Sequence, residues 1–345
     1  MMAGGLAVPG EWLWPTSVIL AALLGSFLNV CISRLPRGES VVLPASRCPH
    51  CHVPIRPIDN LPIVSFLALR GRCRACRGRI SPRYLVVEVL AVGLAVLVLW
   101  ALGPTWTALR SFVLALALLA VTVTDAETHR IPDRITLPGI VAGLVLAPEG
   151  LSRGSAGALA GALLFGAIAS RSRDAGAAPA ARVDPDPEDE VVDPVERRRL
   201  DTLWAATWGA LLGREVGLVA PALMASGDRA GAWRALGVLD APVAGCLVTG
   251  GVFFLVAWVS HRLLGRTGLG GGDIKLAGLI GAFLGPGGGL VAAFVGILLG
   301  GVAAVALLVT GLRRFGDYLA FGPFLAAGGL VAALWGPRLL GWYLG

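Results

Sequence analysis

Apolar runs long enough to cross a lipid bilayer recur along this chain, and no other feature of the sequence limits its fold as strongly. Of the 345 residues, 56% are hydrophobic and only 15% are charged, which excludes an ordinary soluble enzyme. We expect an all-α polytopic membrane protein with about eight to ten transmembrane helices. The predicted runs lie near residues 16–33, 84–102, 107–125, 135–148, 154–170, 242–264, 274–285, 289–310 and 320–343, and a more polar run near 200–224 either spans the bilayer or lies on its surface.

Basic residues are concentrated between the first two predicted spans. Residues 34–83 contain ten arginines against Glu39 and Asp59, so the positive-inside rule places this loop in the cytoplasm and the N-terminus outside. We expect the first apolar run to stay in the protein as a transmembrane helix and not to be cleaved as a signal peptide, because residues 1–15 lack the Lys or Arg that precedes the apolar part of a signal peptide. The loop is tethered to the membrane and poor in aromatic residues, so we expect membrane lipid and no nucleic acid as a partner.

Two CxxC pairs in this loop are the strongest metal signal in the sequence. Cys48 and Cys51 are followed, after 21 residues, by Cys73 and Cys76. Each pair supplies two thiolates from a tight turn, and two pairs complete a tetrahedral four-cysteine site that suits zinc. Disulfides are the alternative, but a cytoplasmic loop is kept reduced. Because four thiolates leave no open position for water, the zinc is expected to be structural and to hold a loop too small to build its own core.

Two aspartates at the ends of apolar runs are the candidate catalytic residues. Asp125 ends the run that begins near residue 107, and Asp273 follows three glycines and opens another run. An ionisable side chain at membrane depth costs about 2.5–3.5 kcal/mol, so its presence indicates a function. Counting the predicted crossings places both acids at the cytoplasmic face. Asp133 competes with Asp125, but its proline and arginine neighbours indicate a capped, charge-compensated loop residue.

The chemistry of this pair follows from holding two carboxyl groups together. In a poorly hydrated site both cannot ionise cheaply, so one stays protonated while the other is charged. The charged group can activate water and the protonated one can polarise a peptide carbonyl, which is aspartyl peptide hydrolysis. The glycines at 270, 271 and 272 would let a substrate strand approach Asp273. A proton or ion relay uses the same residues, and the acids alone do not separate the two functions.

Changes in composition divide the chain into six regions. Acidic residues and prolines between 171 and 200 predict a disordered cytoplasmic loop, since this stretch cannot bury enough apolar surface to fold. In order, the expected regions are a first transmembrane helix (1–33), a small cytoplasmic loop domain stabilised by zinc on four cysteines (34–83), transmembrane helices that include Asp125 (84–170), the acidic loop (171–200), an inserted hydrophobic or amphipathic region (201–241), and transmembrane helices that include Asp273 (242–345).

Several short segments carry a family resemblance when they are taken together. They are 25–29 (GSFLN), 34–36 (RLP), the two CxxC pairs, 59–63 (DNLPI), 69–73 (LRGRC), 80–84 (ISPRY) with Glu88, Asp125 with 132–138 (PDRITLP), 270–276 (GGGDIKL) and 321–326 (FGPFLA). In this order, and over nearly the whole chain, they resemble the type IV prepilin peptidases. Those are bifunctional leader peptidases and N-methyltransferases of type IV pilus and type II secretion systems.

This resemblance implies an intramembrane aspartyl peptidase of the GxGD type, with Asp125 and Asp273 as its catalytic pair. Its substrates would be prepilin-like precursors, cut after a short basic leader that ends in Gly, at the cytoplasmic face of the bacterial inner membrane. The family commonly then methylates the new N-terminus with S-adenosylmethionine. That activity is associated with the cysteine loop, and Gly71 is a candidate contributor.

Three points stay open in the sequence. The region from about 171 to 241 is longer than the family pattern, which leaves the helix count undecided. No feature of the sequence indicates the oligomeric state. A transporter that uses the aspartates as a relay and a membrane scaffold that binds partners through the cysteine loop are the competing hypotheses, although the transporter lacks the internal repeat typical of that class.

Overall fold

The computed structural model describes residues 10–146, 241–264, 270–312 and 319–344. Within these ranges all regular secondary structure is helical, and six helices are long and apolar enough to cross a membrane. The expected all-α membrane architecture is therefore confirmed. The helix predicted near 154–170, the acidic loop at 171–200 and the region at 201–241 lie outside the described residues.

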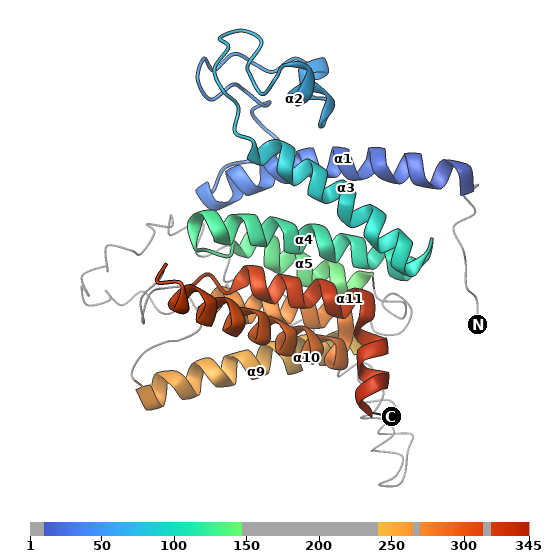
Figure 1. Cartoon of the computed structure of the whole chain (residues 1–345), viewed down its shortest axis with the longest axis vertical. Helices are drawn as coiled ribbons and strands as arrows, with labels where there is room; N and C mark the ends of the chain where they lie inside the picture. Colours follow the sequence, from blue (N-terminus) through green and yellow to red (C-terminus); the bar gives the residue numbers. More distant parts are fainter. Residues whose placement is uncertain (1–9, 147–240, 265–269, 313–318, 345) are drawn as a thin grey trace, which may run out of the picture.

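The long helices lie side by side in one bundle (Figure 1). The described helices are α1 (Gly10–Arg34), α2 (Val64–Ala68), α3 (Arg83–Leu102), α4 (Trp106–Thr128), α5 (Asp133–Val145), α9 (Ala241–Leu264), α10 (Gly271–Val309) and α11 (Gly322–Leu344), with short 3-10 turns η1 (Leu35–Arg37) and η2 (Pro57–Asn60). The predicted runs at 84–102 and 107–125 match α3 and α4 to within three residues at each end.

Local sequence signals set the turn between α3 and α4. Gly103 ends α3 with φ 66° and ψ −175°, a backbone conformation that is essentially restricted to glycine. The hydroxyl of Thr105 accepts a hydrogen bond from the Ala108 N–H (3.1 Å) and caps the start of α4. The two helices are therefore antiparallel, and an ion pair between Arg83 and Glu127 (2.6 Å) joins the start of α3 to the end of α4.

α10 consists of two helical segments joined by a sharp break. Gly285 has φ 73° and ψ 178°, values that no helix contains. A Cβ at Gly289 would lie only 3.3 Å from the Cα of Gly281, so the chain folds back on itself beyond the break. The separate runs predicted at 274–285 and 289–310 are thus confirmed as two segments of one bent element.

Small residues let α9 and the first segment of α10 approach closely. A Cβ added at either Gly245 or Gly281 would overlap the carbonyl group of the other. Such contacts are typical of helix packing in membranes, where small residues allow backbones to meet. Around them, buried side chains from α4, α5, α9, α10 and α11 form the main apolar core, which includes Leu279, Ile280 and Phe283.

The loop between α1 and α3, residues 35–82 and hereafter the cysteine loop, projects from the flank of the bundle beside α1 and the start of α3 (Figure 1). Polar contacts fix its base. The amide of Asn29 donates a hydrogen bond to the carbonyl of Tyr84 (3.0 Å), and the carboxylate of Glu88 accepts one from the backbone N–H of Ile63 (2.7 Å). The cysteine loop is therefore anchored to α3 a little more than one turn inside that helix.

Candidate active site and metal centre

Four helices meet at one end of the bundle, where α4 ends and α5, α10 and α11 begin (Figure 1). Lys275 in the first turns of α10 forms an ion pair with Asp133, the first residue of α5 (2.5 Å). Gly272 packs against the turn between α4 and α5, because a Cβ there would lie 2.8 Å from the Cβ of Ile131. These contacts bring segments that are far apart in the sequence to one place.

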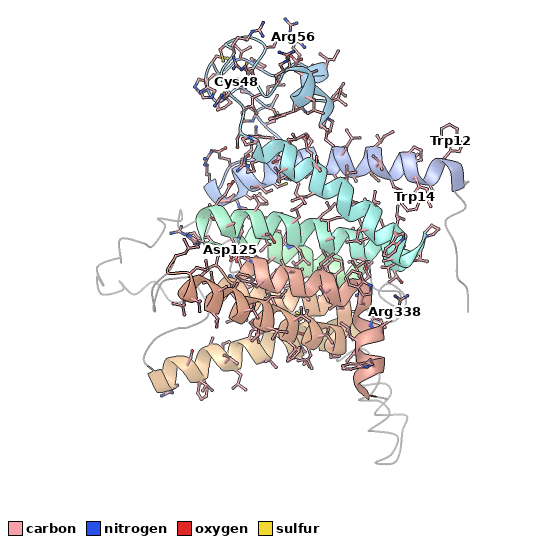
Figure 2. The ribbon with its side chains drawn as sticks, in the orientation of Figure 1. Trp12, Trp14, Cys48, Arg56, Asp125 and Arg338 are labelled. Atoms are coloured by element: carbon pink, nitrogen blue, oxygen red, sulfur yellow. The ribbon has the colours of Figure 1, made fainter. Side chains whose placement is uncertain are left out.

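Asp125 lies in the last turns of α4 and is only 3% exposed. Its Oδ2 accepts a hydrogen bond from the backbone N–H of Gly322, the first residue of α11 (3.1 Å). The first N–H groups of a helix have no partner within the helix, and the helix dipole favours negative charge there. A Cβ at Gly322 would lie 2.5 Å from the same oxygen, so glycine is needed for this approach. Figure 2 shows Asp125 inside the bundle, toward the end where α4 finishes.

Asp273 occupies the first turn of α10 and is 7% exposed. Its Oδ2 accepts a hydrogen bond from the backbone N–H of Gly270, the residue that caps the helix (3.2 Å). Each aspartate is thus held by an N–H group at the start of a helix, Asp273 by its own helix and Asp125 by a neighbouring one. A carboxylate in this position receives a hydrogen bond and the favourable end of the helix dipole together.

The structure brings the two predicted aspartates together, since they lie near enough for their charges to interact. Among the described residues, the buried acidic side chains are Glu88, Asp125 and Asp273. Glu88 accepts the N–H of Ile63, which leaves the two aspartates as the pair of buried acids in the described part of the chain that lie near enough for their charges to interact.

Asp133 does not belong to this pair, because it has its own ion-pair partner. Its two carboxylate oxygens accept hydrogen bonds from the Lys275 ammonium at 2.5 and 2.7 Å. The charge compensation predicted for Asp133 is confirmed, with Lys275 of α10 as a cation, but Asp133 is the first residue of α5 and not the predicted loop residue. Glu127 is exposed and forms the ion pair with Arg83. Both pairs tie helix ends together around the two buried aspartates.

The four predicted cysteines form one compact cluster in the cysteine loop. The sulfur atoms of Cys48, Cys51, Cys73 and Cys76 all lie within 4.8 Å of one another, and none is in a disulfide. Tetrahedral zinc with Zn–S bonds of about 2.3 Å separates its sulfur ligands by roughly 3.8 Å. The Cys48 and Cys76 sulfurs are 3.8 Å apart, so the donor set fits a tetrahedral metal ion.

Two similar turns present these thiols. In the first, the Cys48 N–H donates to the Val53 carbonyl (3.1 Å), and in the second, the Cys73 N–H donates to the Gly78 carbonyl (2.9 Å). Burial disfavours the Cys48 thiolate, but backbone N–H groups and neighbouring thiols outweigh it and lower the pKa of Cys48 to about 7. His50 is hydrogen-bonded through Nε2 to the carbonyl of Arg79 (3.0 Å), so it braces the two turns instead of completing the ligand set.

Gly71 has a clear structural role in the cysteine loop. Its φ of 65° favours glycine, and a Cβ there would lie 3.0 Å from the ring of Phe66 in α2. The carbonyl of Gly71 accepts a hydrogen bond from the Ile80 N–H (2.8 Å). Gly71 therefore connects α2 to the second cysteine turn, and its suggested part in methyl transfer remains a prediction.

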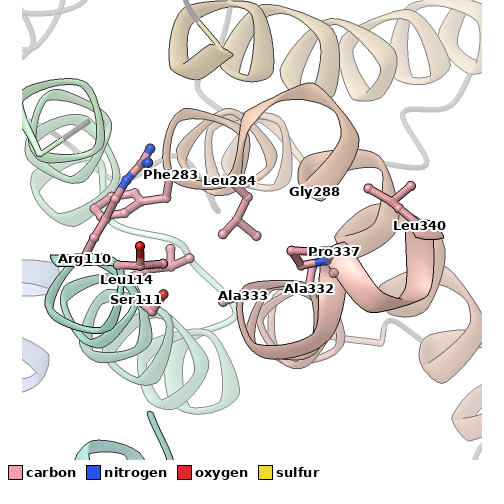
Figure 3. Close-up of a pocket in the computed structure, with 12 residues that line it drawn as sticks. Arg110, Ser111, Leu114, Phe283, Leu284, Gly288, Ala332, Ala333, Pro337 and Leu340 are labelled. Atoms are coloured by element: carbon pink, nitrogen blue, oxygen red, sulfur yellow. The ribbon is translucent and has the colours of Figure 1, made fainter. Parts of the chain in front are cut away.

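A separate cavity of about 320 Å³ lies between α4, α10 and α11 (Figure 3). Its walls are mainly apolar, and Arg110 stands at its edge with the guanidinium over the ring of Phe283 (5.8 Å). Arg110 also donates a hydrogen bond to the carbonyl of Ala282 (3.0 Å), just before the break at Gly285. Arg110 lies 15 residues before Asp125 on α4, or about 22 Å along the helix, so this cavity is distinct from the aspartate site.

Comparison with known proteins identifies the family. Residues 19–102 match the bacterial peptidase A24 N-terminal domain, and residues 112–173 match the type IV leader peptidase family. The prepilin leader peptidase/N-methyltransferase of Aeromonas hydrophila is 30% identical over 96% of this chain and 94% of its own length. The enzyme of the same name from Neisseria gonorrhoeae is 30% identical over 98% and 97%. The chain belongs to the prepilin leader peptidase/N-methyltransferase family.

This membership confirms the resemblance drawn from the motifs, and nothing in the comparisons supports a transporter. The match to the A24 N-terminal domain contains all four cysteines and Glu88, and the match to the leader peptidase family contains Asp125. No solved structure matches the chain significantly. The contact between Gly322 and Asp125 was not foreseen from the residues, although the segment 321–326 was quoted among the family motifs.

Proposed function

We propose that this chain is a membrane aspartyl peptidase that removes the basic leader from prepilin-like precursors, with Asp125 and Asp273 as its catalytic pair. The observation that carries the proposal is the meeting of two buried carboxyl groups, one from α4 and one from α10, at one end of a bundle of apolar helices. Membership of a family whose relatives are named leader peptidases supports the same reaction.

The reaction needs one proton shared by the two carboxyl groups. The charged carboxylate takes a proton from a water molecule as its oxygen attacks the scissile carbonyl carbon, and the protonated partner gives its proton to the carbonyl oxygen. When the C–N bond breaks, the acid formed in the first step protonates the departing amine, and the other carboxylate takes back a proton from a hydroxyl group of the intermediate, which leaves a carboxyl group on the leader. The N–H groups of Gly270 and Gly322 hold the two carboxyl groups in place through these transfers.

The glycines before Asp273 have different surroundings, which suggests where a substrate would pass. A Cβ at Gly271 would meet nothing within 4 Å, whereas one at Gly272 would overlap Ile131. The backbone at Gly271 is therefore open, and the next residue is packed against the turn between α4 and α5. We place the extended cleavage segment of the substrate beside Gly271, at the cytoplasmic face that the arginine-rich cysteine loop predicts.

Two further parts of the proposal concern a zinc ion and methyl transfer. We infer that the cysteine cluster holds one structural zinc ion, because four thiols at tetrahedral spacing leave no position for a reacting water. Zinc would lock the two cysteine turns together and so set the position of Gly71 and α2. We also propose that the chain methylates the new N-terminus with S-adenosylmethionine, as the names of its relatives imply.

The deciding experiment mixes the purified full chain in detergent with a prepilin-like peptide, with and without S-adenosylmethionine, and weighs the products. Asp125→Asn and Asp273→Asn should each abolish leader removal while the protein stays folded. Asp133→Asn is the matched control, because it removes a nearby carboxylate that is paired with Lys275, and it should still cut. Substantial cleavage by either catalytic variant would refute the assignment. Proton flux in liposomes that disappears with Asp273→Asn would support the relay instead.

A further inference from the structure

The short helix α2 carries exposed apolar side chains, although it lies in the arginine-rich cysteine loop. Its inner side faces the protein, where Phe66 packs against Gly71 and the Ile63 N–H reaches Glu88. Its outer side carries Leu61, Val64 and Leu67, which are 47%, 63% and 60% exposed. Exposed apolar side chains that lie together mark a binding or membrane site, and no protein segment among the described residues covers this outer side.

Two of the outer residues share one side of α2. Val64 and Leu67 are three residues apart on the helix and are therefore neighbours on its surface. Leu61 precedes the helix in extended backbone, and its carbonyl is tied to the first turn by a hydrogen bond from the Ser65 N–H (3.1 Å). Ile58 in the preceding turn η2 adds a fourth apolar side chain, 65% exposed. We call Ile58, Leu61, Val64 and Leu67 the outer apolar face.

The attachment point of α2 sets its depth relative to the membrane helices. The backbone N–H of Ile63, which immediately precedes α2, donates a hydrogen bond to Glu88. Glu88 lies five residues after Arg83, the first residue of α3. Five residues of helix correspond to about 7.5 Å, which is within the roughly 5–10 Å by which interfacial helices bury their apolar side below the headgroups. Figure 1 shows the cysteine loop beside α1 and α3 rather than beyond their ends, which agrees with this depth.

The charges around the outer apolar face select the kind of membrane surface. Arg56 and Arg70 lie just before and just after it in the sequence, and both are exposed. The nearest acid, Asp59, accepts three hydrogen bonds from Arg74 at 2.7, 2.9 and 3.0 Å, and it also lies near enough to Arg56 to offset part of that positive charge. An exposed apolar strip flanked by arginines is the pattern that binds anionic phospholipid headgroups.

We propose that the outer apolar face is a membrane-docking site, which inserts into the acyl–headgroup boundary of the leaflet at the aspartate end of the bundle and binds anionic phospholipid through the flanking arginines. The lipid would cover the side of α2 that the protein leaves bare, and it would hold the metal cluster against the membrane beside α1 and α3. This proposal depends on the chain being a membrane protein and is independent of the peptidase reaction.

The test places an environment-sensitive fluorescent amino acid at position 64 of the full chain, reconstituted without substrate in nanodiscs of phosphatidylglycerol and phosphatidylethanolamine. Emission should shift to the blue, and brominated acyl chains should quench most of it. The same label at Ala75, an exposed position between two cysteines, is the control and should report water with little quenching. Unchanged elution of both labelled chains shows that they remain folded.

Two results would overturn the proposal. A label at position 64 that reports water, and is quenched no more than the label at Ala75, would show that α2 stays in solution. Blue-shifted emission without quenching by brominated lipid would show that protein covers the face, either a second copy or another chain. The contribution of charge is tested by exchanging phosphatidylglycerol for phosphatidylcholine, which should weaken quenching at position 64. Equal quenching in both lipids would show that the arginines do not bind anionic phospholipid.

Discussion

Gly322→Ala is the sharpest available test of how the aspartate site is built. The added Cβ would lie 2.5 Å from Oδ2 of Asp125 and 3.1 Å from its Cγ. An ordinary carbon–oxygen contact needs about 3.3–3.6 Å, so either the carboxylate or the start of α11 must move by roughly 1 Å. Gly322 has no left-handed φ, so the backbone itself accepts alanine and the effect comes from this one contact.

A catalytic group displaced by about 1 Å can lose roughly 100-fold in rate. We therefore expect kcat/KM for leader cleavage to fall by about two orders of magnitude, equivalent to roughly 2.7 kcal/mol of transition-state stabilisation. The assay is cleavage of a prepilin-like peptide by purified protein at several substrate concentrations, with thermal unfolding measured in the same detergent. Stability should change little, because no core side chain is removed.

The matched control is Gly336→Ala, which makes the same change further along α11. A Cβ there would lie 3.9 Å from the Cβ of Ala332, which is a normal contact. Alanine should stabilise the helix by up to about 1 kcal/mol and leave cleavage unchanged. Wild-type cleavage by Gly322→Ala, or an equal loss in Gly336→Ala, would show that the hydrogen bond from α11 to Asp125 does not position the carboxylate.

Three other predictions follow from the structure. Cys48→Ser should lower bound zinc from about one ion per chain to none in metal analysis and make the cysteine loop sensitive to protease. Progressive acidification should likewise release zinc, because protons compete with the metal for the thiolates. Lys275→Met and Asp133→Asn should each destabilise the protein by up to about 1 kcal/mol in denaturation curves, and the double variant should lose no more than either alone. Arg110→Leu should destabilise by about 1–3 kcal/mol, because the Ala282 carbonyl loses its donor, whereas Arg110→Lys should lose less.

The parts of the fold that local sequence controls were predictable. The ends of α3 and α4 follow from the apolar runs and from the glycine and threonine that separate them. The break in α10 follows from Gly285 and the proline after it, which interrupt a long apolar stretch. The cysteine cluster was predictable because two CxxC pairs can close only one kind of tetrahedral site.

The contacts that complete the aspartate site depend on how distant segments pack, and sequence spacing does not encode them. Lys275 is two residues from Asp273 in the sequence. On a helix, residues two apart point in different directions, and Lys275 instead reaches Asp133 of α5. The bond from Gly322 to Asp125 joins residues 197 positions apart, so only the packed bundle reveals it.

The arrangement explains how a membrane protein can bury two acids in one place. Isolated carboxylates buried among apolar helices would be strongly disfavoured, but each aspartate here accepts an N–H at the start of a helix, from Gly270 for Asp273 and from Gly322 for Asp125. The starts of α10 and α11 thus supply two donors and two partial positive charges to the same small volume. Glycine is required for this approach in the Phe-Gly-Pro-Phe segment, because a Cβ at Gly322 would overlap the carboxylate of Asp125, whereas a Cβ at Gly270 would lie at an ordinary contact distance from Asp273 (3.5 Å).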